Sequence, residues 1–165
     1  NYYYLIEEYL CGESLYARIE RTGSLQTGEL IRLGIELCRI MNYLHSFKPN
    51  PILYLDLHPG NLLICREQLK LIDFDQAALA SLSQERSVCY GTKGFAAPEQ
   101  YEGGTLDERT DIYAIGALLY YMGTGHAPEG EIKAGQGSCR GDLYILMGRC
   151  LRIEKKSAAR VSGKC

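Results

Sequence analysis

The sequence lacks several features that mark particular classes of protein. It has no tryptophan, only five prolines, and 18 basic against 20 acidic residues, which leaves a net charge of −2. A chain so close to neutral has no overall positive field to attract nucleic acid, so we expect no nucleic-acid partner. Its 165 residues, 46% of them apolar, suffice for one compact domain and argue against intrinsic disorder.

Cysteine and membrane patterns are also missing. The seven cysteines form an odd set with no C-x-x-C pair and no zinc-finger spacing to histidine, so we expect neither a disulfide framework nor a structural zinc site. A reducing, cytoplasmic location follows. The longest weakly polar stretch, residues 112–125, is shorter than the about 20 residues that cross a bilayer, so we expect no membrane segment within this chain. Because no signal peptide precedes it and the chain begins at Asn1, we expect a fragment of a longer protein, which could itself be membrane-anchored.

The spacing of apolar residues predicts a mainly helical chain with a few short strands. Helices are expected over residues 15–21, with Ser14 as the N-cap, and over residues 26–47, 107–123 and 141–151. Strands are expected over residues 2–9, 62–65 and 69–72, the last two forming a hairpin. Residues 76–93 show no clean period and predict a loop.

The residues with chemical potential lie between positions 54 and 99. Asp56 and Asn61 stand five positions apart, and Asp73 directly follows a short apolar run. A carboxylate at the end of a buried strand is poorly solvated, so a cation, a hydrogen-bond donor or a substrate proton is its natural partner. Phosphoryl transfer uses such a set, with one carboxylate to orient the attacking hydroxyl and oxygen ligands for Mg²⁺. Taken alone, such residues more often cap loops.

The order of the motifs resembles one family. Residues 54–61 resemble the protein-kinase catalytic loop H-R-D-L-x-x-x-N, residues 73–75 resemble D-F-G, and residues 97–99 read A-P-E. Residues 8–12 look like the hinge between the two kinase lobes, and residues 91–92 look like the Gly-Thr of the substrate-binding loop. The resemblance covers nearly the whole chain, and its wording is similar to that of bacterial eukaryotic-like Ser/Thr kinases.

The later part of the chain carries two further likenesses to protein kinases. Asp111 with Gly116 looks like the start of the central helix of the large lobe. Arg160 is similar to the late arginine that pairs with the A-P-E glutamate, here Glu99, and Lys156 is its rival.

This resemblance implies an α+β fold, a protein-kinase-like C-terminal lobe that is mainly α-helical with short β-hairpins carrying the catalytic loop. Residues 1–165 would form a partial kinase domain, consisting of the hinge and the C-terminal lobe. The N-terminal lobe would be missing and the C-terminal end truncated. Since no Gly-rich loop or strand lysine precedes the hinge, we expect the isolated fragment to be nearly inactive.

The resemblance also implies roles in catalysis. Asp56 would be the catalytic base or hydroxyl-orienting residue, and His58 takes the place of the family's lysine two positions later. Thr92 would hydrogen-bond near Asp56 and position the substrate, although a turn threonine is an equally good interpretation. Asn61 and Asp73 would hold Mg²⁺ or Mn²⁺.

The nucleotide would be ATP, and the phosphate acceptor Ser or Thr of a protein. The adenine would meet the hinge, where Glu8 and the backbone of Leu10 lie, and Leu63 would form the floor beneath it. Ser14 stands at the ribose-contact position. For Leu10 and Leu63, ordinary core packing explains the residue type as well.

The chain also departs from the family pattern. Tyr54 and Leu55 replace the His and Arg of H-R-D, so no arginine beside the base is available to bind a phosphorylated loop. Asp75 replaces the glycine of D-F-G, which removes backbone freedom and adds a carboxylate.

Two alternatives therefore stay open. The chain could be a pseudokinase that acts as a protein-binding module, or a small-molecule phosphotransferase similar to aminoglycoside phosphotransferases, in which His after Asp-Leu is at home.

Overall fold

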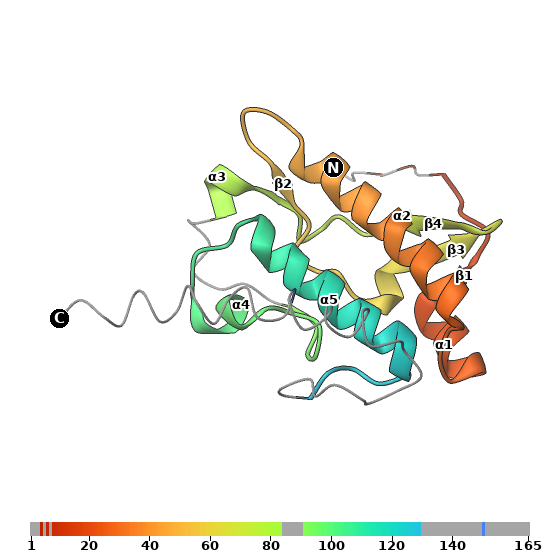
Figure 1. Ribbon diagram of the computed structural model, residues 1–165. Coiled ribbons are helices and arrows are strands. Elements are labelled where there is room, and N and C mark those ends of the chain that lie inside the picture. The colour runs from red at the N-terminus through yellow and green to blue at the C-terminus, as the bar shows by residue number, and fades with distance from the viewer. Residues whose placement is uncertain (1–3, 5, 7, 84–90, 130–149, 151–165) are drawn as a thin grey trace.

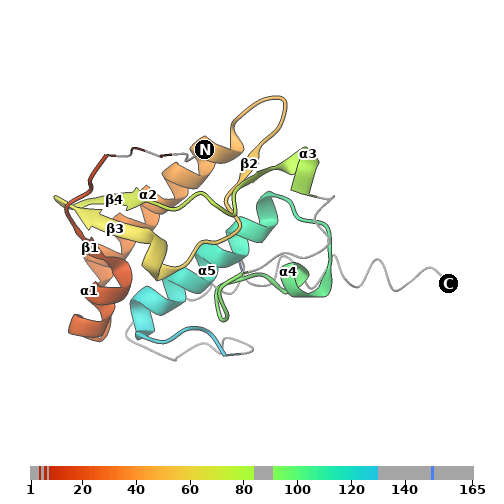
Figure 2. The same ribbon diagram turned by 180° about the vertical axis from the view of Figure 1, so that it is seen from behind.

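Two long helices organise the molecule. The computed structural model describes residues 4, 6, 8–83, 91–129 and 150. Within them, α2 (Thr27–His45) and α5 (Glu108–Thr124) lie side by side through the middle of the fold (Figures 1 and 2). A Cβ atom added to Gly34 of α2 would stand 2.8 Å from the Leu119 side chain of α5, so the absence of a side chain at Gly34 permits this close approach.

Both long helices confirm the prediction from periodicity. The buried side of α2 carries a stripe of apolar residues at spacings of three and four: Leu30, Leu33, Leu37, Met41 and Leu44. α5 is buried on nearly all sides from Ala114 to Gly123, which fits its almost continuously apolar sequence. Asp107 caps the start of α5, because its carboxylate accepts a hydrogen bond from the Arg109 backbone N–H at 2.8 Å.

A three-stranded antiparallel sheet packs against α2. The short helix α1 directly follows the first strand of this sheet in the chain. The strands are ordered β1 (Glu13–Ser14), β3 (Leu62–Cys65) and β4 (Gln68–Leu71), so the predicted hairpin is confirmed. α1 spans Leu15–Thr22, and its cap is Ser14 as predicted, with the Ser14 hydroxyl oxygen accepting from the Ala17 backbone N–H at 3.1 Å.

The remaining elements are short and were missed by sequence analysis. The segment expected to be one loop, residues 76–93, contains β5 (Ala78–Leu79) and α3 (Ala80–Ser83), and β5 pairs with β2 (Ile52–Leu53). A 3₁₀ turn covers Pro59–Asn61, and α4 covers Pro98–Glu102. Two-residue strands have no measurable period, so only their long-range pairing reveals them.

Two predicted elements are not supported or fall largely outside the described residues. No strand includes Tyr4, Ile6, Glu8 or Tyr9, and the other residues of the predicted strand 2–9 are not described. Of the predicted helix 141–151, only Cys150 is described, and it is helical.

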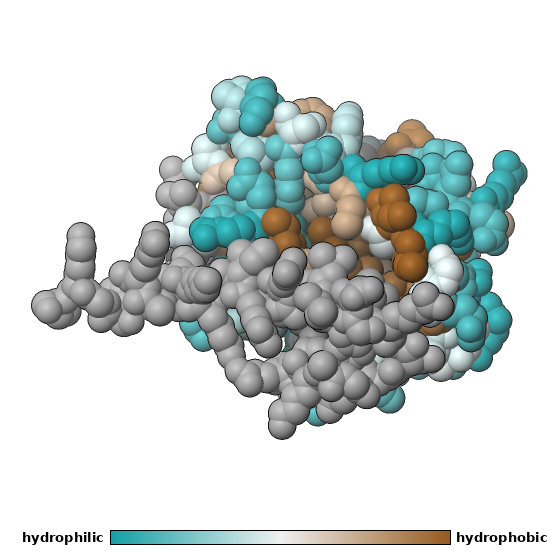
Figure 3. All heavy atoms as spheres, in the orientation of Figure 1, coloured by the Kyte–Doolittle hydropathy of each residue, from teal (hydrophilic) through white to brown (hydrophobic). Residues whose placement is uncertain are grey.

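The fold is α+β and mainly helical, as expected. Most of the coloured surface on the face seen in Figure 3 is hydrophilic, with scattered hydrophobic patches. Within the described ranges, no helix is both long and apolar enough to span a bilayer.

Candidate active site

The site is built on the loop at residues 54–61, which is hydrogen-bonded to Asp111 of α5. Asp111, 1% exposed, accepts hydrogen bonds from the backbone N–H groups of Tyr54 and Leu55, both at 2.9 Å. A third partner is His45 at the end of α2, whose Nε2 lies 2.8 Å from Asp111 Oδ2. A buried carboxylate is costly unless it is paired, so these three donors explain why an aspartate is tolerated inside an apolar helix.

Leu55 is held in a left-handed backbone conformation, with φ of 67°. A non-glycine residue at this φ is strained and persists only where its surroundings enforce it. Its N–H donates to Asp111, and its carbonyl accepts from Nε2 of buried Gln100 at 2.7 Å. The loop that carries Asp56 is thereby fixed to both α5 and α4.

The Leu55 side chain occupies an apolar cluster. It is 4% exposed and packs with Leu53 and Leu106, while Ala78 and Ala80 pack against the same cluster. Where the kinase pattern has a phosphate-binding arginine, Leu55 of this chain makes hydrophobic contact with the segment at residues 78–80.

Tyr54 connects the loop to Asp73. Its hydroxyl donates to the backbone carbonyls of Ile72 and Asp73, the latter at 2.8 Å, and its ring packs edge-on against Phe74 with centroids 5.3 Å apart. Burial raises the pKa of the Tyr54 phenol, so the hydroxyl stays a donor at neutral pH. Tyr54 therefore links the loop that carries Asp56 to the backbone at Asp73 through a hydroxyl that does not titrate near pH 7.

Asp56 is surrounded by the residues that the sequence predicted around it. Its Oδ1 accepts from the Thr92 hydroxyl at 3.0 Å, and its Oδ2 lies 3.4 Å from Asn61 Nδ2 and 3.6 Å from His58 Nε2. His58 Nδ1 accepts from the Gly60 backbone N–H at 3.1 Å, which assigns the proton of the neutral ring to Nε2, the atom that faces Asp56. Two predicted catalytic residues thus converge on the third.

The predicted metal ligands lie on neighbouring strand ends. The β3–β4 register pairs Leu62 with Leu71, and the Ile72 N–H donates to the Asn61 carbonyl at 3.0 Å, which brings Asn61 next to Asp73. Asp73 has φ of 60°, and its Oδ1 accepts a hydrogen bond from the Asp75 backbone N–H at 3.2 Å.

These residues fit a divalent cation. Asn61 is 7% exposed; its Nδ2 donates to the backbone carbonyl and the carboxylate of Asp56, and its side chain also forms a hydrogen bond with that of Tyr54. A buried amide next to a carboxylate offers the kind of oxygen ligands that Mg²⁺ prefers. The described residues contain no group of three or more His, Cys, Asp or Glu side chains arranged around a metal position.

The predicted nucleotide residues are only partly brought together. Ser14 and Leu63 are directly paired in the β1–β3 register, and Leu63 is half-buried while its neighbours Leu62 and Ile64 are buried. Glu8 is exposed and Leu10 half-buried, both in the irregular segment before β1, and no hydrogen bond or ion pair joins them to other described residues.

Three supporting residues were missed or undervalued by sequence analysis. His45 is the last residue of α2, and its ring contacts the buried Asp111. Gln100 drew no attention, although its side chain bonds both Leu55 and the Ala97 N–H. Glu99 accepts from the Thr110 hydroxyl at 2.8 Å, and its predicted partners, Arg160 and Lys156, lie outside the described residues. The sequence signal for a buried, hydrogen-bonded Asp111 is its position as a polar residue in a mostly apolar helical stretch.

Comparison with known proteins identifies the family. The model of the protein kinase domain matches residues 1–157. The chain therefore belongs to the protein kinase family, as the motifs had indicated.

Its relatives come from plants, animals and bacteria. It is 32% identical over 129 residues to integrin-linked protein kinase 1 of Arabidopsis thaliana, covering 73% of this chain and 27% of that protein. It is 30% identical over 134 residues to a probable serine/threonine-protein kinase of Clostridium acetobutylicum, with 78% and 20% covered. The serine/threonine-protein kinase PknB of Mycobacterium leprae is 32% identical over 130 residues, with 76% and 20% covered. The matched region thus spans about a quarter or less of these relatives.

Proposed function

We propose that the protein containing this chain transfers the γ-phosphoryl group of ATP to serine or threonine hydroxyls of protein substrates, in the cytoplasm. The observation that carries the proposal is the 3.0 Å hydrogen bond between the Thr92 hydroxyl and Asp56 Oδ1. This bond connects Asp56, whose carboxylate would act on the substrate hydroxyl, with the loop that leads into Ala97-Pro98-Glu99. The names of the bacterial relatives support the Ser/Thr class.

In the proposed reaction, the substrate hydroxyl oxygen forms a bond to the γ-phosphorus as the bond to the β–γ bridging oxygen breaks. Asp56 accepts the hydroxyl proton through one of its two oxygens. Thr92 and Asn61 hold the carboxylate in place, and His58 can donate its Nε2 proton to a phosphate oxygen.

Asn61 and Asp73 would hold Mg²⁺ or Mn²⁺, which supplies positive charge beside the nucleotide phosphates when bound. Ser14 and Leu63, paired across β1 and β3, would contact the ribose and adenine. Glu8 and Leu10 would contribute the hinge.

The first experiment is Asp56→Asn in the complete protein. We expect kcat to fall by about 10²–10⁴-fold, because general base catalysis is lost, while the Kd for ATP changes little. Initial rates with a serine peptide and a fluorescence titration with ATP measure the two quantities. Glu102→Gln, an exposed position on α4, is the control. Equal turnover in wild type and Asp56→Asn would refute the role of Asp56, and absence of turnover in the wild type would favour the pseudokinase alternative.

The second experiment tests the hydrogen bond between Thr92 and Asp56. Thr92→Ala should lower kcat/KM for a serine peptide about tenfold, because a hydrogen bond to a charged group is lost, whereas Thr92→Ser keeps the hydroxyl and should stay within about twofold of wild type. Parallel assays with an aminoglycoside address the second alternative. Faster phosphorylation of the aminoglycoside than of any peptide, with no effect of Thr92→Ala, would favour the small-molecule phosphotransferase.

A further inference from the structure

Tyr101 on the short helix α4 contacts the loop that carries Thr92. Its hydroxyl donates to the backbone carbonyl of Gly91 at 3.1 Å. This carbonyl belongs to the peptide bond between Gly91 and Thr92, so the hydrogen bond holds the planar peptide group that leads into Thr92. Thr92 in turn donates to Asp56 Oδ1 at 3.0 Å. Tyr101 therefore acts on the peptide group next to the hydrogen bond on which the proposed function rests.

Gln100, the residue before Tyr101, makes the matching contact on the other side of the site. Its Nε2 donates at 2.7 Å to the carbonyl of Leu55, in the peptide bond that leads into Asp56. Gln100 is buried, whereas Tyr101 is exposed. Two consecutive side chains of α4 thus hold the peptide groups that precede the donor and the acceptor of the Thr92–Asp56 hydrogen bond.

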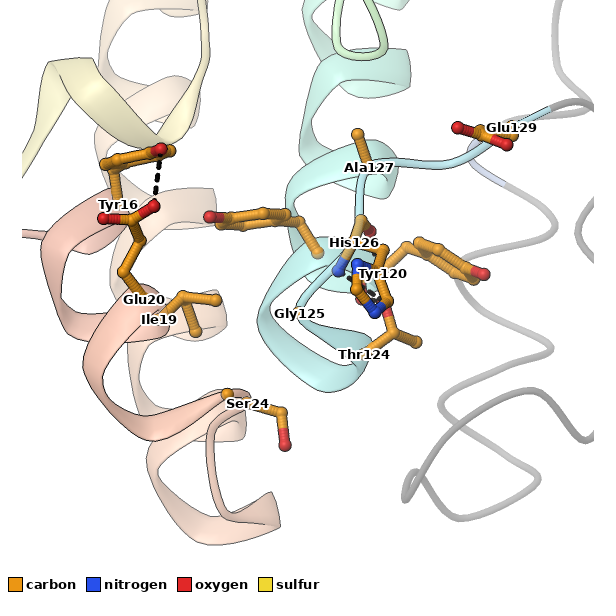
Figure 4. Close-up of a pocket in the computed structure, with 12 residues that line it drawn as sticks. Tyr16, Ile19, Glu20, Ser24, Tyr120, Thr124, Gly125, His126, Ala127 and Glu129 are labelled. Atoms are coloured by element: carbon orange, nitrogen blue, oxygen red, sulfur yellow. Dashed lines mark hydrogen bonds between the residues drawn. The ribbon is translucent and has the colours of Figure 1, made fainter.

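The chain after Thr92 has other supports. The Thr92 carbonyl accepts from the Phe95 backbone N–H at 2.9 Å, which closes a turn. The Phe95 ring packs edge-on against Tyr121 with centroids 5.5 Å apart. A Cβ atom added to Gly94 would lie 2.9 Å from the side chain of Ala127, which lines the pocket between α1 and the C-terminal end of α5 (Figure 4). This side of the loop is therefore held by a turn and by packing.

The chain before Thr92 is held differently, because Gly91 has no side chain to pack. A Cβ atom added to Gly91 would lie 2.3 Å from the Ala96 side chain and 3.1 Å from Gln100 Nε2, so the close approach of these residues requires glycine. Glycine leaves the backbone freer to rotate than any other residue does. The hydrogen bond from Tyr101 opposes that rotation at the Gly91 carbonyl.

We propose that Tyr101 is a positioning residue of the phosphoryl transfer. By holding the peptide group between Gly91 and Thr92, its hydroxyl directs the Thr92 side chain toward Asp56 and keeps the carboxylate aimed at the substrate hydroxyl. Tyr101 acts through Thr92 and takes no part in the chemical step. The inference rests on the proposed function, because its effect on the rate requires that Asp56 act on a substrate hydroxyl.

The test compares Tyr101→Phe with the wild type in the complete protein. The change removes the hydroxyl and keeps the ring, so kcat for a serine peptide should fall about three- to fivefold, the size expected for one exposed hydrogen bond. KM for the peptide and the Kd for ATP should stay within about twofold, because the carboxylate acts in the transition state. Tyr43→Phe, at an exposed tyrosine of α2, is the matched control and should behave as the wild type.

A double-mutant cycle distinguishes positioning from a general structural effect. If Tyr101 acts through the Thr92 hydroxyl, Tyr101→Phe should cost nothing further once Thr92→Ala has removed that hydroxyl. Independent effects of the two substitutions would instead multiply. An equal loss of kcat from Tyr101→Phe with threonine and with alanine at position 92 would overturn the inference.

A measurement without phosphoryl transfer separates this inference from the proposed function. The NMR chemical shift of the Thr92 methyl carbon depends on its χ1 rotamer, and the signal is assigned by its absence in Thr92→Ser. Tyr101→Phe should move this signal, and Tyr43→Phe should not. A moved signal without phosphorylation of any peptide would show that Tyr101 orients Thr92 although the proposed function fails. If peptides are phosphorylated while Tyr101→Phe changes neither the signal nor kcat, the inference is overturned and the proposed function stands.

Discussion

Asp111 and Glu13 accept the same number of hydrogen bonds but lie in opposite surroundings. Asp111 accepts from two backbone N–H groups and His45 with its side chain 1% exposed, whereas Glu13 accepts from Arg18 and Arg21 with its side chain 30% exposed. At the surface, an ion pair replaces hydration of the two charges that is nearly as favourable, so it contributes little to the free energy of unfolding. In the interior, removing one partner leaves the other buried polar groups without a hydrogen bond. The same number of hydrogen bonds therefore contributes far more to the free energy of unfolding. Burial, more than the number of hydrogen bonds, therefore decides which of these two carboxylates contributes more to stability.

The strongest way to break this comparison is Asp111→Ala. We expect the free energy of unfolding to fall by about 3–5 kcal/mol, because the N–H groups of Tyr54 and Leu55 and the His45 ring lose their buried acceptor. Urea unfolding followed by circular dichroism measures the loss. Asp111→Asn, which keeps the shape and one acceptor, should lose less and gives a folded variant if the alanine form does not fold. Glu108→Ala, in the first turn of the same helix, is the control, and an equal effect of all three changes would contradict the argument.

A middle case is Asp107, which caps α5 and pairs with Arg109. Burial raises the pKa of Asp107, but hydrogen bonds from the Arg109 side chain and backbone outweigh that effect and hold the pKa below its ordinary value of 3.8. The resulting stability is therefore present above about pH 4 and disappears as the pH falls through the lowered pKa. Asp107→Asn keeps the cap and loses the charge, so it should cost about 0.5 kcal/mol at pH 7 and progressively less as the pH falls toward 2. Urea midpoints across this pH range measure it, and a cost that persists in acid would show that the charge is irrelevant.

The smallest effect is expected for Glu13→Gln. Hydrogen bonds from Arg21 and Arg18 lower the pKa of Glu13, yet the whole cluster lies at the surface and is screened by salt. The urea midpoint should change less than for Asp107→Asn, and 0.5 M NaCl should remove most of the difference. A loss as large as that of Asp111→Asn would mean that the cluster around Arg18 acts as a buried network.

The sequence predicted those parts of the fold that depend on neighbouring residues. The helices around Leu37 and Leu118 and the hairpin at residues 62–71 follow from local spacing, as does the Ser14 cap. β2 and β5 do not, because each has two residues and they form only by pairing Ile52 with Leu79. Short strands of this kind depend on the tertiary fold.

The same distinction applies to the site. Asp56, Asn61 and Asp73 stood out because their motifs resemble a known family, and the structure places them together. The sequence marked Asp111 as the start of a helix but did not predict its contacts, since Asp111 meets Tyr54 across 57 positions and His45 across 66. Such contacts arise from helix packing, for which local sequence carries no pattern.

The apolar cluster around Leu55 has a thermodynamic consequence of its own. Leu55 of the catalytic loop and Ala78 and Ala80 of the following segment share one small hydrophobic core with Leu53 and Leu106. A phosphate held by an arginine loosens as salt rises, whereas apolar burial is nearly indifferent to ionic strength and weakens on cooling, because its driving force near room temperature is entropic. The order of residues 78–80 thus responds to temperature and scarcely to the ionic composition of the surroundings.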